Sequence, residues 1–143
     1  MIKAGIIGST GYAGGELARL LLQRDDIEIK WYGSRSYIDQ KYASIYQNMF
    51  RIVDDVCMDD NMKELAEQVD VVFTATPQGL CASLMDEDVL SKVKVIDLSA
   101  DFRIKDVSVY EKWYKLTHAS PQFIGEAVYL SLIHISEPTR HSL

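Results

Sequence analysis

The sequence has few cysteines and no apolar run long enough to cross a membrane. Cys57 and Cys81 are the two thiols among 143 residues, which excludes a disulfide-rich secreted scaffold. A membrane-spanning helix needs about 20 consecutive apolar residues, and no such run occurs. No signal peptide precedes the first apolar strand, which begins at Ile2. We therefore expect a soluble, cytoplasmic protein with no membrane partner.

Basic residues are also scarce. The chain has 15 Lys and Arg against 21 Asp and Glu, a net charge of −6. An acidic chain is poorly suited to coating nucleic acid, so we expect no nucleic-acid partner. Hydrophobic residues make up 48% of the sequence, enough to build a core, which argues against disorder. The length is that of one domain.

A glycine-rich turn near the start organises the rest of the chain. Gly8, Gly11 and Gly14 form a G-x-x-G-x-x-G run. It follows an apolar strand over residues 2–7 and leads into an amphipathic helix over residues 12–24. Strand, glycine turn and helix form the front end of a dinucleotide-binding unit, where helix N–H groups and the helix dipole attract a pyrophosphate. The alternative is a glycine turn used only for packing. The agreement of all three parts favours nucleotide binding.

The end of the second strand predicts which dinucleotide binds. In NAD-binding units an acidic residue near this point takes the ribose hydroxyls. Here the strand over residues 27–32 is followed by Gly33, Ser34, Arg35 and Ser36, with no Asp or Glu at its end. A guanidinium flanked by hydroxyls suits a 2′-phosphate, which predicts NADP rather than NAD. The alternative is a solvated loop arginine.

Strands and helices alternate along the remainder of the chain. Strands are expected over residues 52–58, 69–76 and 93–98, helices over residues 60–68, 80–90 and 106–115, and a loop with a short helix over residues 37–50. This alternation predicts an α/β protein with a Rossmann-type, doubly wound and mostly parallel sheet. Ligands bind at the carboxyl ends of such strands. The loops at Gly8, at Thr76 and Pro77, and at residues 99–103 should therefore line one cleft.

Five motifs resemble the N-acetyl-gamma-glutamyl-phosphate reductase family of semialdehyde dehydrogenases. They are Gly8-Ser9-Thr10-Gly11-Tyr12-Ala13-Gly14, Ser34-Arg35-Ser36, Ala75-Thr76-Pro77-Gln78-Gly79, Asp97-Leu98-Ser99-Ala100-Asp101-Phe102-Arg103 and Glu126-Ala127-Val128-Tyr129. The run that begins at Asp97 is the most specific of them. The resemblance covers residues 1–129, which we expect to form an NADP-binding Rossmann domain.

The resemblance implies an arginine-biosynthesis enzyme that reduces an acyl phosphate to a semialdehyde with NADPH, through a cysteine thioester. It places the pyrophosphate on Gly8, Ser9, Thr10, Gly11, Tyr12, Ala13 and Gly14, the 2′-phosphate on Ser34, Arg35 and Ser36, and the nicotinamide side on Thr76 and Pro77. Ser99 and Arg103 would bind the acyl phosphate substrate. For Arg103 the alternative is an ion pair with Asp101 or Asp106. No metal is implied, and the complete enzyme is expected to be a homo-oligomer.

The family pattern breaks at residue 130. Family members continue into a substrate domain with the cysteine nucleophile and a catalytic histidine, whereas residues 130–143 resemble translated vector sequence at a truncated gene end. We therefore expect a sheet truncated before the substrate domain, and no catalytic residue in this chain. Cys81 is interpreted as a core residue, Cys57 as structural and His118 as a surface residue.

Two other functions stay open. One is a non-enzymatic NAD(P)-binding or redox-sensing module, and the other is a related dehydrogenase of the aspartate-semialdehyde type. A bare sensor would not need the run from Ser99 to Arg103, so this run favours the reductase.

Overall fold

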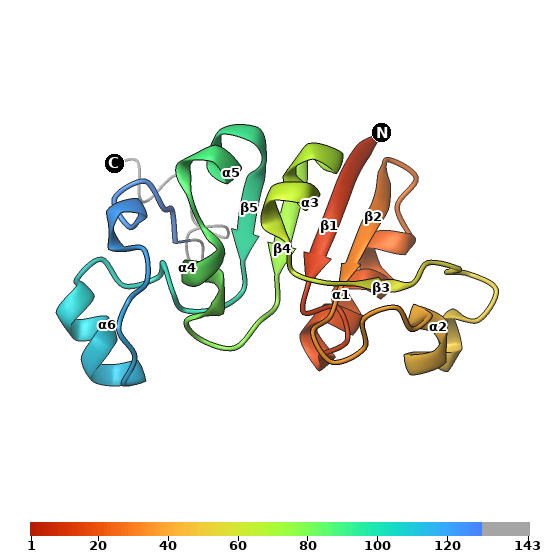
Figure 1. The fold of residues 1–143 in the computed structure, drawn as a ribbon, viewed down its shortest axis with the longest axis horizontal. Coiled ribbons are helices and arrows are strands. Elements are labelled where there is room, and N and C mark those ends of the chain that lie inside the picture. Colours follow the sequence, from red (N-terminus) through yellow and green to blue (C-terminus); the bar gives the residue numbers. More distant parts are fainter. Residues whose placement is uncertain (130–143) are drawn as a thin grey trace, which may run out of the picture.

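The computed structural model describes residues 1–129 and places their strands in one parallel sheet. The strands are β1 (Ile2–Ile7), β2 (Ile27–Gly33), β3 (Cys57–Met58), β4 (Val71–Thr74) and β5 (Lys94–Asp97). Their order is β3-β2-β1-β4-β5, and every adjacent pair is parallel (Figure 1). The chain winds from the centre to one edge and then to the other, which is the doubly wound Rossmann order. The predicted fold class is confirmed, while the tail predicted over residues 130–143 lies outside the described residues.

Helices cover both faces of this sheet. They are α1 (Tyr12–Leu22), α2 (Tyr42–Ile45), α3 (Met62–Gln68), α4 (Leu80–Leu84), α5 (Glu87–Lys92) and α6 (Val107–Tyr114), with 3-10 turns η1 (Gln47–Met49) and η2 (Pro121–Phe123). Ala18 of α1 belongs to the core on one face, and Leu65 of α3 and Val89 of α5 belong to the core on the other. Neighbouring β1 residues divide between the two: Ile6 enters the first core and Ile7 the second. No helix within residues 1–129 is long and apolar enough to cross a bilayer.

Two predicted elements differ from the structure. The helix expected over residues 80–90 is two helices, because Met85 is extended (φ −83°, ψ 134°) and Asp86 starts α5. The Asp86 carboxylate accepts a hydrogen bond from Val89 N–H at 2.8 Å, and such a cap favours a new helix start. The strand expected over residues 52–58 shortens to β3, since the two residues before it pair with the segment after β2: Asp55 O accepts from Tyr42 N–H at 3.0 Å, and Val56 forms an antiparallel bridge with Lys41.

The carboxyl ends of the strands lie side by side at one end of the sheet, which is the lower end in Figure 1 and is called the carboxyl edge below. Backbone hydrogen bonds join them: Ala75 N–H donates to Ile7 O, and Leu98 N–H donates to Thr74 O, each at 2.9 Å. The loops after β1, β4 and β5 therefore follow one another along the edge where this fold binds its ligands.

A buried carboxylate braces the loop after β5 against α4 and α6. Asp101 has no exposed surface, and its side chain accepts hydrogen bonds from Gly79 N–H (2.8 Å), Ala82 N–H (3.0 Å) and Tyr110 Oη (2.7 Å). Burial raises the pKa of Tyr110, which keeps its hydroxyl a donor. Asp101 therefore serves the fold.

The predicted surface position of His118 is wrong, because the same brace buries it. Its Nε2 donates to the Asp101 carbonyl, and its Nδ1 accepts from Ser120 N–H at 3.1 Å. Its ring also lies edge-on to Phe102 and Tyr110, with centroid distances of 5.3 and 5.0 Å. Both ring nitrogens are thus used inside the protein.

Asp101→Ala should lower the free energy of unfolding by about 3 kcal/mol, because it leaves buried donors without an acceptor. Tyr110→Phe removes one hydrogen bond and should cost about 1 kcal/mol. Urea denaturation of the two variants beside the wild-type chain measures both values. Equal costs for the two substitutions would contradict the brace.

Candidate functional site

The glycine loop closes tightly because two of its glycines have no room for a side chain. Gly8 has φ +81°, and a Cβ there would lie 2.2 Å from Ala75 O. A Cβ on Gly14 would lie 2.0 Å from Gly8 O, so the first turn of α1 packs directly on the end of β1. These two glycines hold helix, loop and strand in contact.

The front of this loop presents amide groups with no partner. Gly11 caps α1 without a side-chain hydrogen bond. Within residues 1–129, the N–H groups of Thr10, Tyr12, Ala13 and Gly14 find no acceptor. A Cβ at Gly11 would have no neighbour closer than 3.6 Å, so the backbone stays open to a ligand. Uncapped N–H groups at the start of an 11-residue helix attract an anion.

The back of the loop is fixed to the end of β2. Gly33 O accepts hydrogen bonds from Gly8 N–H (3.0 Å), Ser9 N–H (2.9 Å) and Ser9 Oγ (3.0 Å). Thr10 Oγ1 and Ser34 Oγ share a hydrogen bond of 2.8 Å. Ser9 and Ser34 are buried, so their hydroxyls hold the loop and leave its backbone to meet a ligand.

Arg35 lies just after β2, and the fold brings an acidic residue, Asp60, beside it from a distant part of the sequence. The Arg35 side chain is 63% exposed, and its Nε donates to Asp60 Oδ2 at 2.5 Å. Asp60 comes from the segment after β3. In the described part of the chain no hydrogen bond forms from either Nη of Arg35, so the outer edge of the guanidinium can meet a phosphate. Ser36 beside it is exposed.

Thr76 carries an unpaired polar atom at the exit of β4. Its Oγ1 is buried and has no hydrogen-bond partner among residues 1–129. Its methyl lies 3.3 Å from the position of a Cβ on Gly8, so it borders the glycine loop, and Pro77 follows it. A buried hydroxyl without a partner costs free energy unless a ligand bonds it. This atom fits a polar group of a dinucleotide lying along the loop.

The two predicted substrate residues of the Ser99–Arg103 run differ: Ser99 bonds within its own loop, and Arg103 is exposed. Ser99 bonds within the loop: its N–H and Oγ both donate to Asp97, each at 2.8 Å. Arg103 points outward, with its guanidinium 5.6 Å from the centre of the Tyr129 ring. The alternative for Arg103, an ion pair with Asp101 or Asp106, is not found among residues 1–129.

A shallow pocket lies beside Arg103, in the last of the three loops. Arg103 lines a shallow pocket of about 280 Å³ with Ile104, Val109, Trp113 and Tyr114, all from the loop before α6 or from α6 itself. The glycine loop and Thr76 are not in its lining. The single cleft expected from the sequence stays a prediction, and Arg103 lies in the last of the three loops along the carboxyl edge.

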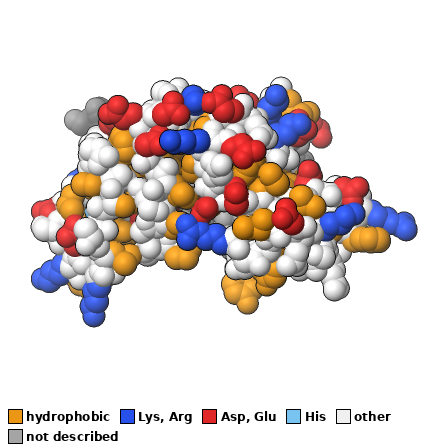
Figure 2. Space-filling view, in the orientation of Figure 1, with side chains coloured by type: hydrophobic (Ala, Val, Ile, Leu, Met, Phe, Trp, Pro, Cys, Tyr) orange, Lys and Arg blue, Asp and Glu red, His pale blue; other side chains and the backbone are white. Residues whose placement is uncertain are grey.

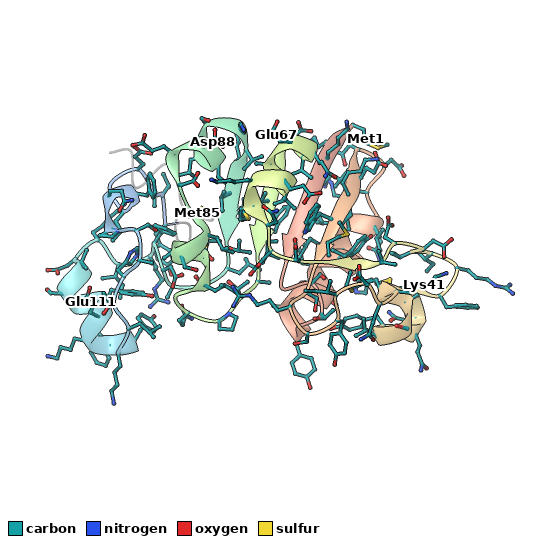
Figure 3. The ribbon with its side chains drawn as sticks, viewed as in Figure 1. Met1, Lys41, Glu67, Met85, Asp88 and Glu111 are labelled. Carbon is teal, nitrogen blue, oxygen red and sulfur yellow. The ribbon has the colours of Figure 1, made fainter. Side chains whose placement is uncertain are left out.

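Acidic side chains gather at the opposite edge of the sheet (Figure 2). Glu67 and Asp88, labelled in Figure 3, belong to it, and both pair with Lys92. The six residues of β1 span about 20 Å, more than twice the screening length of about 8 Å at physiological salt. The negative charge there has little effect on an anion at the glycine loop.

Neither cysteine of the chain is suited to nucleophilic chemistry. Cys57 and Cys81 are fully buried. Burial raises the pKa of both thiols, and the nearby Asp97 raises that of Cys81 further. The interpretation of Cys81 as a core residue is confirmed.

Together, the sheet order, the glycine loop and the uncapped α1 define an α/β dinucleotide-binding domain. The semialdehyde dehydrogenase NAD-binding domain family matches residues 3–131, and the chain belongs to this family. A nicotinamide dinucleotide is the cofactor class of this domain.

The chain is similar to N-acetyl-gamma-glutamyl-phosphate reductases, and the similarity covers 90% of its own length. It is 70% identical to that of Lachnospira eligens and 43% identical to that of Heliobacterium modesticaldum, each over 129 residues. The chain spans 37% of the length of these relatives. An aspartate semialdehyde dehydrogenase from Candida albicans, solved with NADP, shares the fold at 20% identity, with a TM-score of 0.55 over 75% of this chain and 32% of that one.

Neither thiol should react with iodoacetamide in the native protein at pH 8, because burial raises their pKa values and blocks access. Both should react after unfolding in guanidinium chloride, which provides the control. Mass spectrometry of the two samples counts the labels. A label on Cys81 in the native sample would show that this thiol is reactive.

Proposed function

We propose that this chain is the cofactor-binding domain of an NADPH-dependent N-acetyl-gamma-glutamyl-phosphate reductase. The observation that carries the proposal is the row of unpaired amides at the start of α1, beside the unpaired hydroxyl of Thr76. The names of the relatives supply the substrate and the reduction, and the semialdehyde dehydrogenase family supplies the class of product, a semialdehyde. We place the protein in the cytoplasm, which agrees with its two buried thiols, which form no disulfide.

The residues present fit the dinucleotide. The backbone of residues 8–14 would hold the pyrophosphate, and the exposed Arg35 and Ser36 would meet the 2′-phosphate, with the buried Ser34 holding the loop beside them. Thr76 and Pro77 would border the nicotinamide. The bound cofactor supplies a hydride, and the domain's own part is to bind and orient it.

The acyl phosphate would meet this domain at Arg103. Its planar guanidinium can pair with two phosphoryl oxygens, and it stands at the same edge as the glycine loop. Because both thiols are buried, the nucleophile would come from the part of the relatives that this chain does not span. We expect the complete enzyme to be a homo-oligomer.

The structure changes how this proposal is distinguished from a redox sensor. Ser99 and Asp101 are used by the fold, so a sensor with the same fold would also need them. Arg103 now favours the reductase within this run, because it forms no ion pair among residues 1–129 and its guanidinium lies over the Tyr129 ring. The 70% identity to a reductase is the stronger support.

NADPH should bind the wild-type chain more tightly than NADH, and Arg35→Ala should weaken NADPH binding about tenfold while leaving NADH unchanged or tighter. Without the guanidinium, the carboxylate of Asp60 would stand unpaired beside the 2′-phosphate and repel it. Fluorescence titration with each cofactor measures the four Kd values. Arg51→Ala is the matched control, because Arg51 is a loop arginine that lies over the Phe50 ring. Equal losses for NADPH and NADH would overturn the 2′-phosphate role, and a wild-type chain that binds neither would overturn the proposed function.

Thr76→Val should weaken NADPH binding about fivefold without lowering the melting temperature of the unliganded chain. The substitution removes a buried hydroxyl that has no partner in the protein, so only the bound state should lose a hydrogen bond. Thr74→Val is the contrasting variant: Thr74 Oγ1 donates to Asp97 at 2.8 Å, so its loss should lower the melting temperature. Unchanged NADPH affinity in Thr76→Val would remove Thr76 from the site.

A further inference from the structure

Two tyrosines from the segment after β2 contact the glycine loop from behind. Tyr42 Oη donates to Ser9 O at 2.8 Å, and Tyr46 Oη lies 2.9 Å from Thr10 O and 2.8 Å from Gly11 O. The carbonyls of three successive loop residues therefore all face tyrosine hydroxyls.

These contacts fix the direction of the amides on the other side. A trans peptide is planar, so its N–H points away from its C=O. Holding Ser9 O toward Tyr42 directs Thr10 N–H away from it, and holding Gly11 O toward Tyr46 does the same for Tyr12 N–H. Those two N–H groups are among the ones that find no acceptor within residues 1–129.

The tyrosines are themselves held in place. Tyr42 is fully buried, and its ring lies between those of Tyr32 and Tyr46, with centroid distances of 4.6 and 5.4 Å. A Cβ on Gly15 would lie 2.5 Å from the Tyr46 ring, so this ring packs flush against α1. Burial raises the pKa of Tyr42 and Tyr46, so both hydroxyls remain donors at neutral pH.

We propose that Tyr42 and Tyr46 are positioning residues that orient the glycine-loop amides for the cofactor pyrophosphate. The inference rests on the proposed function, since it names what prepares the same site. A phenylalanine would fill the same space, so ring packing alone would not need the hydroxyls. Their oxygens meet three loop carbonyls, and amides aligned before binding lose less freedom when the anion arrives.

The test separates orientation of the loop from general stability. NADPH and adenosine 2′-monophosphate, which has the 2′-phosphate but no pyrophosphate, are titrated against the full chain by calorimetry. Tyr46→Phe should raise the Kd for NADPH about three- to tenfold, the loss of one hydrogen bond, and leave the Kd for adenosine 2′-monophosphate unchanged. Tyr42→Phe should act in the same direction. Tyr114→Phe on α6 is the matched control, because its hydroxyl makes no hydrogen bond among residues 1–129.

Each outcome decides the question. Unchanged NADPH affinity in Tyr46→Phe, with a wild-type chain that binds NADPH, would overturn the inference and leave the proposed function standing. Equal losses for both ligands, or a large fall in the melting temperature of Tyr46→Phe, would assign the hydroxyl to general stability and also overturn it. Failure of the wild-type chain to bind NADPH would overturn both. If Tyr42→Phe does not fold, Tyr46→Phe decides alone, because its hydroxyl lies nearer the surface.

Discussion

The carbonyl oxygen of Gly33 holds the glycine loop, on which the proposed cofactor site depends. It accepts three hydrogen bonds, one from Gly8 and two from Ser9. It can do so because β1 and β2 run parallel and, after a register shift between Ala4 and Gly5, pair as far as Ile7, which lies opposite Gly33. The pairing of the ends of β1 and β2 thus sets where the glycine loop begins. The loop in turn sets where the amides of α1 point.

The loop has a satisfied side and an unsatisfied side. Toward the protein, Gly33 and the two tyrosine hydroxyls bond its polar groups. Toward solvent, its amides have no partner within residues 1–129, and the buried hydroxyl of the neighbouring Thr76 has none there either. A fold gains nothing from leaving such groups unpaired, so their concentration at one edge is the physical mark of a binding site. The same reasoning separates Asp101, whose oxygens are all used within the fold, from Arg103, which projects outward.

Local patterns were enough to predict the strands other than β3, the glycine loop and the doubly wound sheet, since apolar runs and glycine spacing act over a few residues. The residues that support the site could not be predicted this way. Tyr46 bonds Gly11 across 35 positions, Arg35 meets Asp60 across 25, and Asp101 bonds Gly79 across 22. The tyrosine-rich segment over residues 37–50 was visible in the sequence, but only the fold shows which carbonyls its hydroxyls reach. His118 was misplaced for the same reason: Asp101 and Phe102, which bury it, come from the loop after β5.

Because Gly15 packs closely against the Tyr46 ring, the residue type at either of these positions limits which residue types the other can accept. A methyl group at position 15 has no space while the ring is present, and a smaller side chain at position 46 would free that space but also remove a hydroxyl from the loop. Helix propensity favours alanine over glycine inside α1, so drift toward alanine is opposed here by the ring. We therefore expect positions 15 and 46 to covary among relatives: glycine with tyrosine, or a larger residue at 15 with a smaller side chain at 46 and a different group supporting the loop.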